Sequence, residues 1–128
     1  MYFDKIKSNA KINLALNITG KSNNLHKIET IVAFIDLYDQ ILIKKINTKK
    51  NFIKFCGKFS KNIQSNNTIS KLFKILEQKR LIKQKYYIKI NKNIPQKAGL
   101  GGGSMNAANI LKYLIKKKVI FINKREMF

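Results

Sequence analysis

The sequence predicts an α+β domain with strands in its first half and helices mainly in its second. Three observations lead to this prediction. Residues 10–57 hold segments that either alternate apolar with polar residues or are rich in β-branched residues, as strands do. The period becomes helical after residue 67, returns to that of a strand, and becomes helical again after a glycine cluster. At 128 residues, 45% of them hydrophobic, the chain is one domain or part of one.

Four segments of the first half have the pattern of strands. Residues 10–19 alternate and predict a half-buried strand. Residues 28–37 are β-branched and apolar, which favours a strand buried on much of both faces, although the pattern also fits a helix. Residues 39–47 and 52–57 predict two further strands joined by a hairpin, and residues 20–24 predict a turn or loop. The buried face of the first strand is expected to carry Ile12, Leu14, Leu16 and Ile18.

The second half predicts two helices around one more strand. The first helix has its apolar residues at spacings of three and one, with Asn67 or Thr68 placed to cap it. Residues 85–91 alternate again as a strand, and a second apolar stripe predicts a helix from Ser104 to about Lys118. Asn123 and Glu126 form a capping-box pattern, so a third helix is expected to begin there. Since the chain stops within a turn or two of that point, we expect the C-terminal part of a larger protein to follow.

The charge of the chain is strongly positive, with 27 Lys and Arg against 6 Asp and Glu and a net charge of +21. Such a field attracts polyanions, but the excess is almost all lysine and is scattered through every predicted element. A lysine excess scattered in this way is explained better by the base composition of the genome than by a dedicated nucleic-acid surface. The single cysteine excludes an internal disulfide, and no apolar run reaches transmembrane length. These features predict a cytoplasmic or organelle-matrix protein without a membrane partner.

The glycine cluster is the strongest functional signal. Four of the six glycines fall within residues 99–103, directly before the second predicted helix. Glycines there allow the backbone to approach an anion closely, and the helix start offers unpaired N–H groups, so the segment suits a polyphosphate. It is neither a P-loop, which needs a lysine after the glycines, nor a dinucleotide fingerprint, since Ser104 stands where the last glycine is required. A purely structural turn capped by Ser104 is the alternative.

The stretch IPQKAGLGGGSMNAA resembles the phosphate-binding motif of the GHMP small-molecule kinases. The N-terminal stretch SNAKINLALNITGKSNNLHKIETI independently resembles the opening of those members that phosphorylate a hydroxyl of a cytidine diphosphate sugar alcohol, in the non-mevalonate route to isoprenoid precursors. The resemblance covers about the first half of such an enzyme. It implies a GHMP-kinase N-terminal domain over residues 1–128, with the mixed sheet and one-sided helices that these kinases share with a ribosomal protein domain. It also implies ATP and Mg²⁺ as cofactors, with no metal site made of protein ligands alone.

The resemblance implies roles for individual residues. Lys11 matches the catalytic lysine near the substrate hydroxyl, where a positive charge stabilises phosphoryl transfer. Asn13 matches a substrate-side polar position, and His26 matches the histidine that recognises cytosine. Taken without the resemblance, Lys11 is a solvated strand residue and His26 an exposed loop histidine. The segment that would wrap the ATP phosphates consists of Pro95, Gln96, Lys97, Ala98, Gly99, Leu100, Gly101, Gly102, Gly103, Ser104 and Met105.

Several positions depart from the pattern of these kinases. Leu25 replaces the aromatic residue before the histidine, Asn9 replaces a proline, and Met105 replaces a serine of the glycine motif. The Gly-Ala-Asp segment that carries the catalytic aspartate is absent, and Asp4, Asp36 and Asp39 are not in a matching context. We therefore expect a truncated and inactive chain whose C-terminal half is missing. A basic nucleic-acid-binding module of the same fold and a non-functional remnant are the alternatives.

Overall fold

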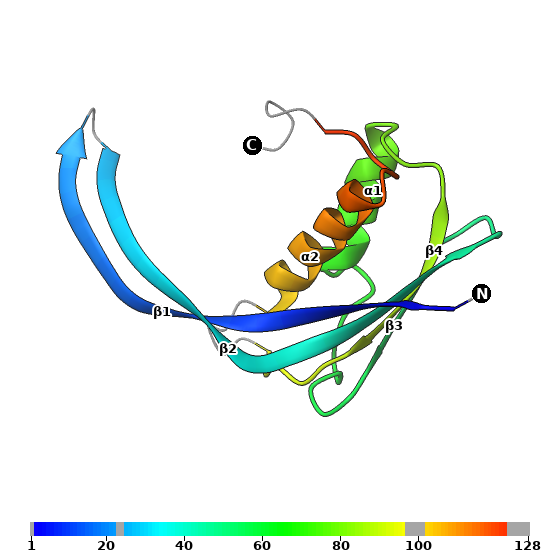
Figure 1. Cartoon of the computed structure of the whole chain (residues 1–128), viewed down its shortest axis with the longest axis horizontal. Helices are drawn as coiled ribbons and strands as arrows, with labels where there is room; N and C mark the ends of the chain where they lie inside the picture. The colour runs from blue at the N-terminus through cyan, green and yellow to red at the C-terminus, as the bar shows by residue number, and fades with distance from the viewer. Residues whose placement is uncertain (1, 23–24, 97–101, 123–128) are drawn as a thin grey trace.

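The computed structural model describes residues 2–22, 25–96 and 102–122, and for residues 13 and 15–31 it describes the backbone path but not the side chains. Two helices pack on one side of a four-stranded sheet (Figure 1). This confirms the predicted α+β fold with a mixed sheet and helices on one side. The elements are β1 (Asp4–Ser22), β2 (Leu25–Ile46), β3 (Phe52–Cys56), α1 (Thr68–Gln78), β4 (Lys85–Asn91) and α2 (Gly102–Lys116).

The strand order in the sheet is β1-β2-β4-β3, so β4 lies between β2 and β3. β1 with β2 and β2 with β4 are antiparallel, whereas β3 and β4 are parallel. Parallel neighbours need a long crossover, which α1 supplies. The predicted hairpin between residues 39–47 and 52–57 is therefore wrong. Asn51 explains the difference, because its side chain bonds the backbone N–H of Tyr86 (2.8 Å) and Oε1 of Glu77 (3.0 Å), which directs the connection toward β4 and α1.

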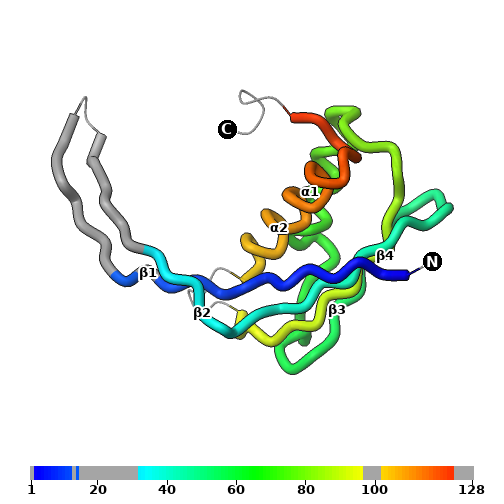
Figure 2. The backbone as a smooth tube through the Cα atoms, in the orientation of Figure 1, coloured from blue at the N-terminus to red at the C-terminus, as the bar shows by residue number. Residues whose placement is uncertain are grey.

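Residues 28–37 and 39–47, predicted as two strands, form the single strand β2. β2 pairs with β4 only from Gln40 to Ile46, while its pairing with β1 continues to Leu25. The sheet thus narrows to a two-stranded ribbon, made of residues 8–22 of β1 and residues 25–39 of β2. On this ribbon Leu14 and Phe34 are each 63% exposed, so the burial predicted for them is wrong. The physical reason is that β4 and the two helices lie only at the four-stranded part of the sheet, so they do not cover the ribbon (Figure 2).

The core lies between the helices and the four-stranded part of the sheet. Every second residue of β4 is buried, as its alternation predicts. Asn67 caps α1 by accepting from the N–H groups of Ile69 and Ser70, and Ser70 completes a capping box, which confirms the predicted start of this helix. The buried side chains include Ile41 and Ile43 of β2, Tyr86, Ile88 and Ile90 of β4, Ile69, Phe73 and Leu76 of α1, and Ile110 and Leu114 of α2.

Gly57 shapes the turn that follows β3. Its φ is +97°, and a Cβ there would lie 2.8 Å from the carbonyl oxygen and 2.9 Å from the nitrogen of Lys92. The nitrogen of Lys92 donates to the carbonyl oxygen of Cys56 at 2.7 Å. Only glycine allows this close approach together with the left-handed φ. The turn therefore fixes the backbone just after β4, where the chain leads into the glycine-rich segment.

α2 begins at Gly102, two residues before the predicted Ser104, and ends at Lys116 rather than Lys118. The helix expected from Asn123 lies outside the described residues. Within the described part of the chain, neither helix has the length and apolar character needed to cross a membrane.

Candidate functional site

The N-terminal end of α2 is accessible and positively polarised. Gly103 and Ser104 are exposed, and Gly102 and Met105 are half-buried. The first N–H groups of a helix have no intrahelical acceptor, and the aligned peptide dipoles place about half a positive charge at this end. The first turn contains no acidic side chain that would offset this charge. The helix start is therefore suited to an anion such as a phosphate group.

The remaining predicted phosphate-binding residues divide into two groups. Pro95 is half-buried, and Gln96 is exposed, with its Nε2 donating to the carbonyl oxygens of Phe59 (2.7 Å) and Lys61 (3.0 Å). The Gln96 side chain is thus held by the loop that follows β3. The other group lies outside the described residues and comprises Lys97, Ala98, Gly99, Leu100 and Gly101.

Gly102 brings the helix start close to the segment that follows β4. A Cβ at this position would lie 3.2 Å from Cγ2 of Ile94 and 3.3 Å from Nζ of Lys92. Both distances are tighter than ordinary contact, so a larger side chain would push α2 away from that segment. The structure thus gives a steric reason for a glycine at this position, in addition to any approach by a ligand.

Asp39 is a fully buried carboxylate of β2 that joins the segment after β4 to α2. Its Oδ1 accepts from the N–H groups of Asn93 (2.7 Å) and Ile94 (2.9 Å). Its Oδ2 accepts from Nδ2 of Asn106 (2.9 Å) and from the ammonium of Lys92, which is itself buried. We call these five residues the Asp39 clasp.

The sequence pattern does not predict the Asp39 clasp, because Asp39 stands in an ordinary strand pattern and outside the context of a catalytic aspartate. The signals that point to it are Lys92, a lysine just after an alternating strand, and Asn106, an asparagine on the buried face of a helix, since buried polar groups need partners. Oδ1 of Asn106 is buried and has no donor within the described residues, so its amide group is held through Nδ2.

β1 and α2 run in opposite directions with the helix inclined to the strand (Figure 2), and two side-chain contacts join them. Asp4 accepts from the hydroxyl of Tyr113, and the buried hydroxyl of Ser8 accepts from Nδ2 of Asn109 at 3.0 Å. Lys11 is three residues beyond Ser8 on β1, and Gly102 is seven residues before Asn109 on α2.

The three residues predicted to act on substrate are spread along the ribbon. Lys11 is half-buried and pairs with Phe34, next to a register shift between Asn9 and Lys11. Asn13, two positions beyond Lys11, pairs with Val32, and the structure describes its backbone only. His26 pairs with Lys21 near the far end of the ribbon, about 26 Å along the strand from Phe34, and again only its backbone is described. Lys11 lies toward the end of the ribbon that contacts α2 through Ser8, and the backbone of His26 lies at the other end.

Residues 67–127, which include α1, β4, the glycine-rich segment and α2, match the family model described as the GHMP kinases N terminal domain. Residues 67–127 thus belong to a GHMP kinase N-terminal domain. Over 123 residues the chain is 59% identical to the 4-diphosphocytidyl-2-C-methyl-D-erythritol kinase of Pelagibacter ubique. The matched region is 95% of this chain and 44% of that protein. The kinase of the same name from Clostridioides difficile is 40% identical over 112 residues, 87% of this chain and 38% of that protein. The chain thus spans less than half the length of these relatives.

Solved structures support the same fold for the GHMP kinase domain. A crystal structure of 4-(cytidine 5'-diphospho)-2C-methyl-D-erythritol kinase superposes with a TM-score of 0.69 at 24% identity, over 94% of this chain and 42% of that one. Mevalonate kinase from methicillin-resistant Staphylococcus aureus superposes with a TM-score of 0.60 at 17% identity, over 98% of this chain and 42% of that one. At these identities the likeness establishes the fold alone.

A metal ion held by protein ligands alone would need several acidic, histidine or cysteine side chains close together. Nowhere in residues 2–22, 25–96 and 102–122 do three His, Cys, Asp or Glu side chains gather in a way that would hold a metal ion. Both oxygens of Asp39 are already engaged by protein donors, so this carboxylate is not free as a ligand. Magnesium usually binds through one or two carboxylates together with substrate phosphates.

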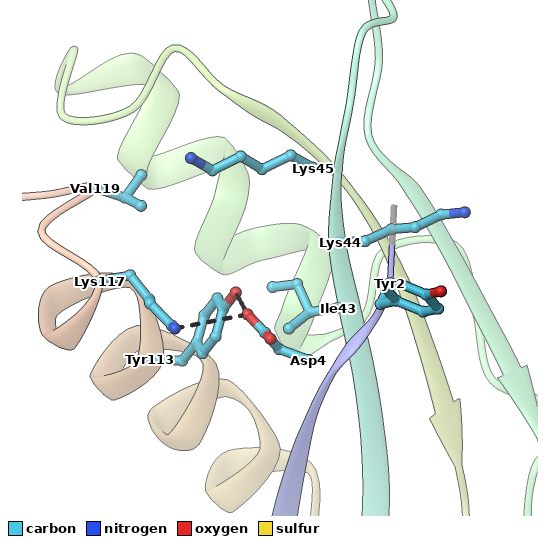
Figure 3. Close-up of a pocket in the computed structure, with 8 residues that line it drawn as sticks. All are labelled: Tyr2, Asp4, Ile43, Lys44, Lys45, Tyr113, Lys117 and Val119. Atoms are coloured by element: carbon cyan, nitrogen blue, oxygen red, sulfur yellow. Dashed lines mark hydrogen bonds and ion pairs between the residues drawn. The ribbon is translucent and has the colours of Figure 1, made fainter.

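A separate cavity of about 250 Å³ lies at the opposite end of α2 (Figure 3). There the side chains of Tyr113 and Lys117 point toward Asp4, and Lys117 Nζ lies 3.9 Å from its carboxylate. Burial, and then the hydrogen bond to Asp4, raise the pKa of the Tyr113 hydroxyl. Because this is the C-terminal, negatively polarised end of the helix, it is not the expected position for phosphate. The cavity is lined by Tyr2, Asp4, Ile43, Lys44, Lys45, Tyr113, Lys117 and Val119.

Proposed function

We propose that this chain is the ATP-binding, N-terminal part of a kinase that transfers the γ-phosphoryl group of ATP to a hydroxyl of 4-diphosphocytidyl-2-C-methyl-D-erythritol, a step of isoprenoid precursor synthesis. The observation that carries the proposal is the 59% identity to the Pelagibacter ubique kinase, which extends over 95% of this chain and so includes both the N-terminal strand and the glycine-rich segment. The exposed, positively polarised start of α2 supports it physically.

In this proposal the phosphates of ATP bind at Pro95 to Met105 and Lys11 acts on the transferred group. The free N–H groups at the start of α2 bind phosphate oxygens, and Gly102 allows the helix start to lie close to the preceding segment. The ammonium of Lys11 stabilises negative charge that develops during transfer. The contact of β1 with α2 at Ser8, three residues before Lys11, supports this role.

Asn13 and His26 are proposed to bind the sugar-alcohol and cytosine parts of the substrate. Their positions along the ribbon are compatible with a long substrate, because they lie progressively further from Lys11 along the paired strands. Magnesium, when bound with ATP, would neutralise phosphate charge. Among the described residues 102–105 at the start of α2, the hydroxyl of Ser104 is the one side-chain oxygen that could bind it directly.

Nucleotide binding is the direct test. The 128-residue chain is titrated with ATP in a calorimeter, alongside the variants Gly102→Val and Ala108→Val. Gly102→Val should abolish binding, because its side chain pushes the helix start away from Ile94 and Lys92. Ala108→Val is the matched control: it puts the same side chain on an exposed position of α2 away from the site, and it should bind as the parent does. Absence of ATP binding by the parent chain would contradict the proposal.

The same variants separate a kinase from a basic nucleic-acid-binding module. Such a module would bind RNA with an affinity that falls steeply with salt and would be indifferent to Gly102→Val. A kinase domain would lose ATP binding in that variant at constant ionic strength. Titration with a short single-stranded RNA at two salt concentrations therefore completes the comparison.

Phosphoryl transfer requires a larger protein in this proposal. The chain is fused to the remaining C-terminal part of the Pelagibacter ubique relative, and ATP-dependent phosphorylation of 4-diphosphocytidyl-2-C-methyl-D-erythritol is followed. We expect transfer by the fusion, loss of transfer in Lys11→Met, and no transfer by the 128 residues alone. A fusion that folds and binds ATP but phosphorylates no cytidine diphosphate sugar alcohol would refute the assigned substrate.

A further inference from the structure

Asp39 occupies a position from which it controls both flanks of the glycine-rich segment. On one side it holds the chain just after β4, and on the other it holds the first turns of α2. Resting on the proposed function, we propose that Asp39 is a positioning residue for nucleotide: it fixes these two flanks relative to each other and thereby aligns the N–H groups that bind the phosphates. It acts through the backbone and does not touch the ligand.

The division of contacts between the two carboxylate oxygens is the basis of the proposal. Oδ1 accepts from the N–H groups of Asn93 and Ile94, both on the β4 side of the segment. Oδ2 accepts from Nδ2 of Asn106 on the helix side and from the Lys92 ammonium. One rigid group thus links two segments that are separated in sequence by the residues predicted to wrap phosphate.

A carboxylate is the group best suited to this position. All four of its partners are donors, and an ionised carboxylate offers only acceptors. Asparagine at position 39 would keep one acceptor for the two N–H groups but would turn its own NH₂ toward Asn106 and Lys92. The negative charge also compensates the buried ammonium of Lys92, next to which Gly102 is packed.

A purely structural ion pair between Asp39 and Lys92 would also be buried, but different results are expected from it. Such a pair would stabilise the whole domain, and its loss would lower protection from hydrogen exchange evenly. A positioning residue changes the two flanks first and affects ligand binding at temperatures where the protein remains folded.

The experiment compares ATP affinity and amide hydrogen exchange in four variants of the 128-residue chain. Asp39→Asn should bind ATP at least about tenfold more weakly, and the N–H groups of Asn93 and Ile94 should exchange at least about tenfold faster, with Ile88 unchanged. Asp36→Asn is the matched control, because it removes an exposed carboxylate of the same strand, and it should behave as the parent does. Leu76→Ala destabilises the core away from the site and should retain ATP affinity while folded.

The fourth variant exchanges the two groups and tests rescue. In Asp39→Asn with Asn106→Asp, the amide at position 39 still accepts from the two N–H groups and donates to the new carboxylate. Because Asn106 and Lys92 both contact Oδ2 of Asp39, that carboxylate lies beside the ammonium. Recovery of most of the ATP affinity is expected. If Asp39→Asn does not fold, Asn106→Ala replaces it, since it keeps the ion pair and removes only the bond to α2, and it should weaken ATP binding in the same direction.

The outcomes distinguish this inference from the proposed function. If the parent chain binds ATP and neither Asp39→Asn nor Asn106→Ala weakens it, the positioning role is refuted and the proposed function stands. If the parent chain does not bind ATP, the proposed function fails. The exchange rates then decide whether Asp39 fixes the two flanks: faster exchange confined to them supports this role, and an even change or no change overturns it.

Discussion

Replacement of Gly57 by alanine should destabilise the fold strongly, although the change adds one methyl group. Gly57 has a φ of +97°, a conformation that costs a residue with a side chain about 1–3 kcal/mol. The added Cβ would also lie 2.8 Å and 2.9 Å from backbone atoms of Lys92, which cannot rotate away, and overpacking of this kind costs about 1–3 kcal/mol. The sum, about 2–6 kcal/mol, is comparable with the entire stability of many domains of about 5–15 kcal/mol.

Urea unfolding followed by circular dichroism measures this effect. With a slope of about 2 kcal/mol per molar urea, the midpoint should fall by about 1–3 M. Gly103→Ala is the matched control, because that glycine is in α2 and its added Cβ would lie 3.4 Å from Oγ1 of Thr68, an ordinary contact. This variant should be unchanged or up to about 1 kcal/mol more stable. Equal midpoints for Gly57→Ala and the parent chain would refute the steric and conformational reasoning.

Three further predictions concern the helix cap, the ribbon and a buried hydroxyl. Asn67→Ala removes the acceptor of the capping box and should lower the free energy of unfolding by about 1 kcal/mol in urea titrations, whereas no change would show that α1 starts independently of its cap. Phe34→Ser on the exposed ribbon should change that free energy by no more than about 0.5 kcal/mol, whereas Ile88→Ala in the core should cost about 2–5 kcal/mol; a similar loss from both would mean that the ribbon is covered. The folded state raises the pKa of Tyr113 above its usual value near 10, so the stability linked to its proton is present below pH 10 and is lost as the pH rises further. Between pH 9 and 11 the temperature of thermal unfolding should therefore decline less steeply for Tyr113→Phe than for the parent chain. An identical decline would refute the raised pKa.

Features set by neighbouring residues could be predicted from the sequence. The alternation at residues 85–91 identified β4 and its buried face, since the two faces of a strand differ every second residue. Asn67 identified the start of α1, because a cap acts within three residues of the helix. The glycine cluster located the start of α2 to within two residues. The resemblance to GHMP kinases depended on such continuous stretches, and the family match to residues 67–127 agrees with it.

Features set by partners distant in the chain were missed. A strand such as β3 carries no mark of which neighbour it pairs with, and the short connection after β2 suggested a hairpin although β4 takes the adjacent place. The apolar residues Leu14 and Phe34 suggested burial, but burial depends on whether another layer covers the ribbon. Local pattern cannot supply either answer, because both depend on packing between elements.

The sequence alone determined the kinds of elements, the caps and the glycine-rich helix start, because each depends on backbone conformations and hydrogen bonds within a few residues. Only the tertiary structure decided that Asp39 of β2 joins the end of β4 to α2, and that β1 contacts α2 through Ser8 and Asn109. The partners of Asp39 lie more than fifty residues away along the chain. A buried charge acquires its meaning from such partners, and folding alone brings them together.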